Sequence, residues 1–144
     1  MAKFVLCDTG FWIALYDKRD YYHGEATELF NKLALFHIII PWPVLYEVLR
    51  TRFVRRREYV ITFEKHLKIL KIKYIDDTPY RRIALSELFK SVNKRTISLV
   101  DMIIRKILED KGKHIDYLIT FNEKDFIDIC KKRRISVYSR GMSV

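Results

Sequence analysis

Acidic and amide side chains stand beside apolar segments at several points of this sequence. Five of them follow or flank such a segment: Asp8, Glu47, Asp101, Asn122 and Asp125. Carboxylate and amide oxygens are the ligands that hard divalent cations such as Mg²⁺ and Mn²⁺ prefer, whereas zinc and copper favour His and Cys. Such cations lower the pKa of a bound water and neutralise charge when a phosphodiester is displaced in line. Metal-dependent phosphodiester hydrolysis is therefore the chemistry to expect if the fold brings these residues together.

Each acid also has a purely structural interpretation. Asp8 can cap the helix that follows it, and Asp101 can form a capping box with Ser98. Glu47 can be an exposed side chain at the border of an apolar stripe, and Asp125 can be a first-turn acid favoured by the helix dipole. A common functional site is favoured over four separate structural roles if the acids share one location, because helix caps do not require that four acids surround one point. Clustered carboxylates repel one another, so the cluster needs raised pKa values or a bound cation.

The elements that must position these residues are strands that alternate with helices along the sequence. Apolar runs predict strands at residues 4–8, 37–40, 71–76, 117–121 and 135–138. Helical spacing predicts helices at residues 24–36, 50–73 and 124–132, and another that begins at Pro43. A further helix is predicted after Thr78, which would be its N-cap, with Pro79 as its first residue. The last is predicted to begin at Ser98 and to end with Gly112 in the C′ position. We therefore expect an α/β fold in a single domain over residues 1–144, with a central, mostly parallel five-stranded sheet flanked by helices.

The place of each acid relative to the strands is informative, because parallel sheets bind ligands at the carboxyl ends of their strands. Asp8 ends the first strand, and Asn122 and Asp125 follow the fourth. Glu47 lies in the helix entered after the second strand, and Asp101 in the first turn of the helix that leads to the fourth. We expect these residues to converge on one edge of the sheet.

Composition limits the other functions that the chain can have. Only four glycines occur, and none forms a phosphate-binding loop, so no nucleotide-cofactor site is expected. The two cysteines, Cys7 and Cys130, lie far apart without zinc-ligand spacing, which favours reduced thiols. No apolar run approaches the roughly 18 residues of a membrane span, and no signal-peptide pattern opens the sequence. We expect a cytoplasmic protein with no membrane contact.

The net charge of +10 is concentrated in one segment. Residues 50–73 hold nine Lys or Arg against two Glu, and a second basic run occupies residues 131–134. The interpretation for function is a rim that contacts the phosphates of RNA, in which we expect Arg50, Arg52, Arg55, Arg56 and Arg57 to take part. Tyr59, Phe63 and Tyr74 interleave these bases and are candidates for stacking, although Phe63 continues an apolar stripe. A solvated helical face is the structural alternative.

Four segments of the sequence resemble the motifs of PIN domains, in particular those of the VapC-like toxin ribonucleases. They occur in order along nearly the whole chain: VLCDTGFWIAL at residues 5–15 with DxxHxxA at residues 20–26, PVLYEV at 43–48, SLVD at 98–101 and LITFNEKDF at 118–126. Where many members of the family carry Asp after the fourth strand, this chain has Asn122. Asn122 can still offer a carbonyl oxygen, and Asp125 can supply the charge instead.

The resemblance implies a Mg²⁺- or Mn²⁺-dependent endoribonuclease that leaves 5′-phosphate and 3′-hydroxyl ends. It implies that Asp8, Glu47 and Asp101 serve the metal site, with Glu47 orienting or helping to activate the attacking water and with Asn122 or Asp125 completing the ligands. It also implies a homodimer held inactive by an antitoxin protein.

Three alternatives remain at this stage. The chain can be a non-catalytic RNA-binding module whose acids are caps, or an RNA-processing nuclease without an antitoxin. Asp8-Thr9-Gly10 also matches the triplet of dimeric aspartic proteases, but the scarcity of glycine and the helical periodicity fit that all-β fold poorly.

Overall fold

The computed structural model describes residues 2–138 and is built on a parallel sheet. Its strands are β1 (Phe4–Cys7), β2 (His37–Pro41), β3 (Lys71–Ile75), β4 (Tyr117–Ile119) and β5 (Ser136–Tyr138). The order across the five-stranded sheet is β3-β2-β1-β4-β5, and every neighbouring pair is parallel. The predicted α/β fold is confirmed, and the all-β protease alternative is excluded.

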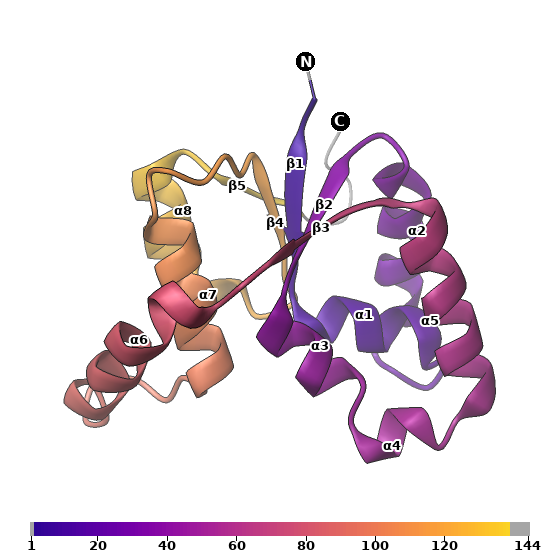
Figure 1. Ribbon diagram of the computed structural model, residues 1–144, viewed down its shortest axis with the longest axis horizontal. Helices are drawn as coiled ribbons and strands as arrows, with labels where there is room; N and C mark the ends of the chain where they lie inside the picture. The colour runs from indigo at the N-terminus through magenta and orange to yellow at the C-terminus, as the bar shows by residue number, and fades with distance from the viewer. Residues whose placement is uncertain (1, 139–144) are drawn as a thin grey trace.

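Helices cover both sides of this sheet (Figure 1). They are α1 (Thr9–Tyr16), α2 (His23–Leu33), α3 (Trp42–Val48), α4 (Thr51–Val54), α5 (Arg57–Ile69), α6 (Thr78–Lys90), α7 (Leu99–Glu109) and α8 (Ile127–Arg133), with a short 3₁₀ helix η1 (Glu123–Asp125) before α8. In Figure 1, α6, α7 and α8 lie to the left of the strands, and α1, α2 and α5 lie to the right. No helix within residues 2–138 is long and apolar enough to cross a membrane.

The composition of each strand matches its place in the sheet. Val5, Leu6 and Cys7 of the central strand β1 are completely buried, as expected for a parallel strand covered on both faces. β3 forms one edge, where Lys71 and Lys73 are exposed. Charged side chains on an edge strand discourage pairing with another chain.

Aromatic side chains fill the core between the sheet and the helices α1 and α5. Phe11 and Trp12 of α1 are completely buried, and the Trp12 ring lies 5.4 Å from that of Phe63. Phe63 therefore belongs to the core, as its apolar stripe predicts, and is not a stacking surface for RNA. The Nδ1–H of His23 donates a 2.8 Å hydrogen bond to the carbonyl oxygen of Ala14, which joins the start of α2 to α1.

The prediction of one helix-compatible stretch over residues 50–73 is wrong. The chain forms two helices there, because Arg56 has an extended backbone between α4 and α5. This break lets Phe53 turn inward, where its ring contacts those of Tyr16 and Phe63. The last three residues of the stretch belong to β3.

Four predicted helix boundaries are also wrong. Asp77, not Thr78, is the N-cap of α6, and Thr78 instead donates both its backbone N–H and its hydroxyl to Asp76. α7 ends earlier than predicted, with Asp110 as its C-cap, and the Asp110 carboxylate accepts a 2.8 Å bond from the N–H of Gly112. The helix predicted at residues 124–132 is divided into η1 and α8, and the one at 24–36 ends at Leu33.

Candidate active site

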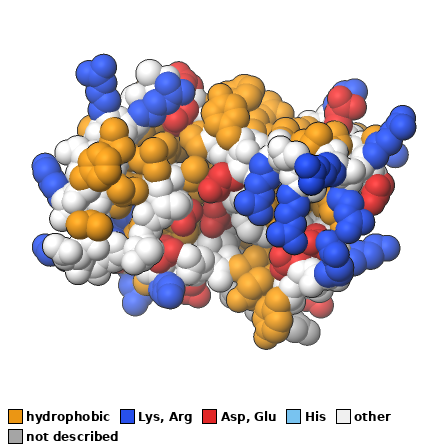
Figure 2. Space-filling view, turned by 90° about the horizontal axis from the view of Figure 1, so that it is seen from below, with side chains coloured by type: hydrophobic (Ala, Val, Ile, Leu, Met, Phe, Trp, Pro, Cys, Tyr) orange, Lys and Arg blue, Asp and Glu red, His pale blue; other side chains and the backbone are white. Residues whose placement is uncertain are grey.

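The predicted acids meet at the carboxyl edge of the sheet. Asp8 follows β1 directly, Glu47 lies on α3 after β2, and Asp101 lies in the first turn of α7. Asn122 and Asp125 follow β4. Figure 2 looks at the molecule from below, onto this edge, and shows red carboxylate side chains in the middle of the face between a basic right half and a more apolar left half.

Asp8 is held from both sides. Its Oδ1 accepts a 2.7 Å hydrogen bond from the N–H of Thr9, and its Oδ2 accepts a 3.0 Å bond from the Thr120 hydroxyl. Asp8 is therefore both a helix cap and a member of the acidic cluster. The pKa of Asp8 is raised to about 6, mainly by burial and to a smaller extent by the charges of Glu47 and Asp125, against the lowering effect of these two hydrogen bonds.

Asp101 lies on α7 and is only partly buried. Its backbone N–H donates a 3.1 Å bond to Ser98 Oγ, so the Ser98 cap that the sequence predicts is present. Burial raises the pKa of the Asp101 carboxyl to about 7, and the charges of Asp8, Glu47 and Asp125 add to that rise. Four carboxylates from four separate elements are thus close enough to repel one another.

Glu47 is fixed by a contact between two helices. The Thr9 hydroxyl donates a 2.6 Å hydrogen bond to Glu47 Oε1 and so joins the start of α1 to α3. Thr9 and Asp8 are neighbours in sequence, so one turn at the end of β1 positions two members of the cluster. The exposed-side-chain interpretation of Glu47 does not describe this arrangement.

Asn122 and Asp125 lie together beyond β4. The Asn122 amide donates to Asp125 Oδ2, and the Asn122 N–H donates a 3.0 Å bond to the Thr120 hydroxyl. Thr120 therefore connects this pair to Asp8. Asp125 contributes the charge that acts on Asp8 and Asp101, whereas Asn122 orients Asp125.

Arg105 holds the backbone beside Asp125, one of the acids of the cluster. The sequence patterns did not identify this residue. It is 6% exposed, and its Nη1 donates a 2.6 Å bond to the backbone oxygen of Asp125. Its two terminal nitrogens also donate to the two Asp128 oxygens at 2.8 and 2.9 Å, which lowers the pKa of Asp128 to about 2. A charged residue within the apolar stripe of α7, four residues after Asp101, was the available signal.

The first basic segment lies beside the acids. A hollow of about 530 Å³ is lined by Arg50, Arg52, Arg55 and Arg56, together with Asp17 and Asp20 on the loop after α1. Arg57 begins α5 and does not line this hollow. In Figure 2 the Lys and Arg side chains gather on the right half of the face, which is the side of α4 and α5.

The second basic run does not flank the acids. Residues 131–134 directly precede β5, so they lie at the amino edge of the parallel sheet, opposite the carboxylates. Arg133 donates to the backbone oxygens of Leu108, Asp110 and Lys113, and so caps the end of α7. Its role is structural.

Solved structures of known proteins share this fold. VapC20 of Mycobacterium tuberculosis, described as a Sarcin-Ricin loop cleaving toxin, is 22% identical, with 86% of this chain and 94% of that one covered and a TM-score of 0.67. The fold is that of VapC. VapBC2 of Rickettsia felis, solved bound to a DNA fragment from their promoter, is 15% identical over 94% of this chain and 97% of that chain, with a TM-score of 0.58. No protein-family model and no curated protein sequence matches the chain.

The acids of this VapC fold offer the donors that Mg²⁺ or Mn²⁺ takes. All of them are oxygens. The raised pKa values of Asp8 and Asp101 come first from burial and then from repulsion by the neighbouring acids, and a bound cation relieves that repulsion. Within the described residues, no three His, Cys, Asp or Glu side chains converge as ligands of one ion. Mg²⁺ commonly keeps several waters and binds one or two protein carboxylates, so the residues fit such an ion.

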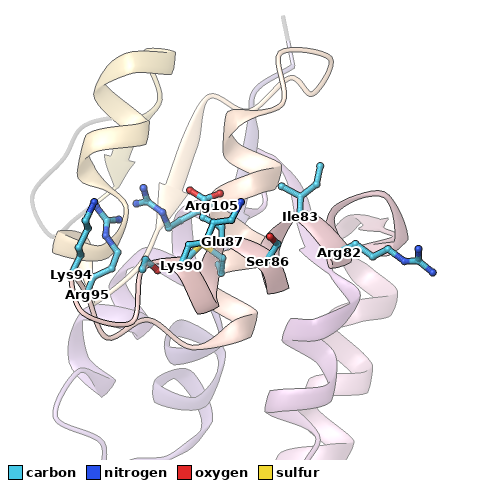
Figure 3. Close-up of a pocket in the computed structure, with 10 residues that line it drawn as sticks. Arg82, Ile83, Ser86, Glu87, Lys90, Lys94, Arg95 and Arg105 are labelled. Atoms are coloured by element: carbon cyan, nitrogen blue, oxygen red, sulfur yellow. The ribbon is translucent and has the colours of Figure 1, made fainter.

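A second basic hollow on the VapC fold was not predicted. The groove between α6 and α7 has a volume of about 790 Å³ and is drawn in Figure 3. Arg82, Lys90, Lys94 and Arg95 line it, and Arg105 reaches its inner wall. Among residues 2–138, the side chains of Arg82, Lys90 and Lys94 form no ion pair. These bases are spread over α6 and the following loop, so no single run in the sequence marks them.

Replacing Thr120 by Val should raise the pKa of Asp8 above its value of about 6. The Thr120 hydroxyl donates to Asp8 Oδ2, and a hydrogen bond to the charged form of a carboxyl lowers its pKa. A ¹³C NMR titration of the Asp8 carboxyl measures the change, with Thr120→Ser as the control that keeps the hydroxyl. An unchanged or lower pKa in Thr120→Val would contradict the assigned hydrogen bond.

Proposed function

We propose that this protein is a Mg²⁺- or Mn²⁺-dependent endoribonuclease that hydrolyses phosphodiester bonds of RNA. The observation that carries the proposal is the meeting of Asp8, Glu47, Asp101 and Asp125 at the carboxyl edge of a VapC fold, where burial and their mutual repulsion raise the pKa of Asp8 and Asp101. Isolated helix caps do not require that arrangement. The toxin VapC20, whose fold this chain shares, cleaves an RNA loop, which supports the same class of substrate.

Each residue of the cluster has a role in this proposal. Asp8 and Asp101 hold the cation, and Asp125, oriented by Asn122, adds its negative charge beside them. Glu47, held by the Thr9 hydroxyl, orients the attacking water and accepts its proton. The cation, when bound, supplies charge neutralisation at the phosphate and a lower pKa for a coordinated water.

A cleavage assay on total RNA tests the proposal. With Mg²⁺ or Mn²⁺ the protein should cut RNA and leave 5′-phosphate and 3′-hydroxyl ends, and EDTA should stop the reaction. Cleavage that persists in EDTA would refute the metal requirement. RNA binding without cleavage under any divalent ion would instead support the non-catalytic RNA-binding alternative.

RNA is held, in this proposal, by bases on both sides of the acids. The hollow lined by Arg50, Arg52, Arg55 and Arg56 lies on the side of α4, and the groove between α6 and α7 lies on the other. Lys and Arg contact phosphates without reading sequence, so these surfaces provide affinity. Arg57 remains a candidate contact because it is exposed at the start of α5.

The double variant Arg52→Ala, Arg56→Ala should weaken RNA binding and make it less sensitive to salt. Each phosphate contact on single-stranded RNA contributes about 0.7 to the slope of log affinity against log salt, so the slope should fall by roughly 1.4. Filter binding in EDTA at several salt concentrations measures this. The variant Lys131→Ala, Lys132→Ala removes the same charge at the opposite edge of the sheet and should leave the slope nearly unchanged. Equal losses in both variants would mean that only net charge matters.

The likeness to VapC20 and to VapBC2 supports a place in a toxin–antitoxin pair. We infer that the chain is the toxin and that a small antitoxin protein covers its acidic edge. Two free, buried cysteines, Cys7 and Cys130, fit the reducing cytoplasm in which this pair would act. Expression of the chain alone should arrest growth, whereas Asp8→Asn should not. Normal growth with confirmed RNA cleavage would favour an RNA-processing nuclease without an antitoxin.

A homodimer is part of the same proposal. Leu85, Phe89 and Val92 recur at helical spacing along α6 and its end and are 42%, 67% and 68% exposed. An exposed apolar stripe of this kind marks a surface for protein contact. Light scattering should give about twice the mass of one chain for the wild type and the mass of one chain for Phe89→Glu. A monomeric wild type at high protein concentration would refute the dimer.

A further inference from the structure

Three exposed aromatic side chains lie near the carboxyl end of β2 and β3, where Trp42 is close to each of the other two. Trp42, Tyr46 and Tyr74 are 43%, 67% and 43% exposed. The ring of Trp42 lies 5.7 Å from that of Tyr74 and 6.3 Å from that of Tyr46, at tilts of 31° and 42°. We call these residues the aromatic platform. The aromatic platform is partly open to solvent, whereas the other tryptophan, Trp12, is completely buried.

The aromatic platform adjoins the acidic edge. Trp42 is the first residue of α3, and Tyr46 directly precedes Glu47 on the same helix. Tyr74 pairs with Ile40 across the sheet, close to where β2 passes into α3. The sheet order β3-β2-β1 therefore places the platform next to Glu47 and Asp8 along one edge.

Arg81 provides a fixed positive charge beside the aromatic platform. Its Nε and Nη2 donate to the two carboxylate oxygens of Asp77 at 2.8 and 3.1 Å, and Asp77 is buried. The Arg81 side chain is nevertheless 55% exposed. The Asp77 carboxylate is the main cause of the raised pKa of Arg81, and Tyr46 is close enough to add to it. A guanidinium held in this way can contact a phosphate while a base lies on the neighbouring rings.

We propose that the aromatic platform binds unpaired nucleotides of the RNA substrate by stacking, with Arg81 on an adjacent phosphate. This inference rests on the proposed ribonuclease function and specifies its substrate as RNA that is single-stranded beside the cleavage site. Stacking needs a base face that is free of its neighbours, which a duplex does not offer. Base–aromatic stacking tolerates any sequence, so the platform selects strandedness and not base identity.

The emission of Trp42 tests the inference directly, because buried Trp12 gives a constant background. The wild type is titrated in EDTA with a single-stranded oligoribonucleotide and with a duplex of equal length. We expect the single strand to quench Trp42 emission and the duplex to leave it nearly unchanged. Trp42→Ala should bind the single strand about tenfold more weakly, and Trp42→Phe, which keeps a ring, should restore most of the affinity.

Leu35→Ala is the matched control, because Leu35 is 68% exposed and lies before β2, at the opposite edge of the sheet. It should bind RNA like the wild type. Equal quenching by single strand and duplex, or binding without quenching, would overturn the platform. The inference would also be overturned if Trp42 emission changed with protein concentration and not with RNA, since that indicates contact between two copies of the protein. Wild type that neither binds nor cleaves RNA would refute the proposed function itself.

Discussion

Asp101→Asn should abolish RNA cleavage and at the same time make the metal-free protein more stable. Asp101 carries one of the two raised pKa values of the cluster, so the substitution removes a ligand and also a repelling charge. The rate should fall by more than about 100-fold, because even residues that only support a metal ligand cost 10 to 100-fold. Asp8→Asn should lose activity in the same way. Its stability gain should be smaller because Asp8 accepts two hydrogen bonds that need a carboxylate.

The gain in stability should depend on pH in a defined direction. The folded pKa of Asp101 is about 7, against an ordinary value of 3.8, so between these pH values the folded state binds more protons than the unfolded state. The free energy of unfolding of the wild type therefore falls as pH rises from about 4 to about 7. Asp101→Asn lacks this group, so its advantage in Tm should be largest near pH 8 and vanish near pH 4.

Calorimetry at both pH values, with and without millimolar Mg²⁺, makes the measurement. Mg²⁺ should raise the Tm of the wild type at pH 8, because it binds the folded acids, and raise that of Asp101→Asn much less. Ser98→Ala is a structural control: it removes the N-cap of α7 and should cost about 1 kcal/mol near pH 4 as well, where Asp101→Asn has no effect. Full activity in Asp101→Asn, or a Tm below that of the wild type at pH 8, would contradict the acidic site.

Arg105→Met should produce the largest loss of stability among the variants considered. It removes the hydrogen bonds to Asp125 and Asp128 from a side chain that is almost fully buried. A fully buried pair that loses one partner costs 3 to 5 kcal/mol, but Asp128 is half exposed and water compensates part of its loss. We expect about 2 kcal/mol, or roughly 7 °C in Tm for a chain of this size.

Urea unfolding measures this effect, and a second variant isolates it. Arg95 also approaches Asp128, at 3.8 Å, but it is 41% exposed. Arg95→Ala should therefore cost less than about 0.5 kcal/mol. Arg105→Lys keeps the charge but not the bidentate contact with Asp128. Its loss of stability should lie between those of Arg95→Ala and Arg105→Met. Similar losses for Arg95→Ala and Arg105→Met would show that the buried geometry contributes little. Because Arg105 holds the Asp125 backbone, Arg105→Met should also slow RNA cleavage.

Much of the fold followed from local pattern. Alternating strand and helix signals predicted the parallel sheet, because apolar runs and helical spacing are properties of short segments. The acids after β1 and β4, and those on α3 and α7, were predicted to meet because every strand of such a sheet presents its carboxyl end to the same edge. The break between α4 and α5 was missed, since the local pattern of residues 50–70 favours a helix, whereas Phe53 packs against Tyr16, a residue distant in the chain.

The sequence by itself determined the fold class, the identity of the acids and the excess of bases, because each is carried by residue type and short-range spacing. The tertiary structure decided what depends on residues distant in the chain. It placed Arg105 behind Asp125, brought the bases of α6 to a groove against α7, and set Tyr74 beside Trp42. These contacts join separate elements, so no local pattern records them. The tertiary structure also placed the basic run at residues 131–134 away from the acids. The run precedes β5, and the direction of β5 in the sheet puts the run at the opposite edge.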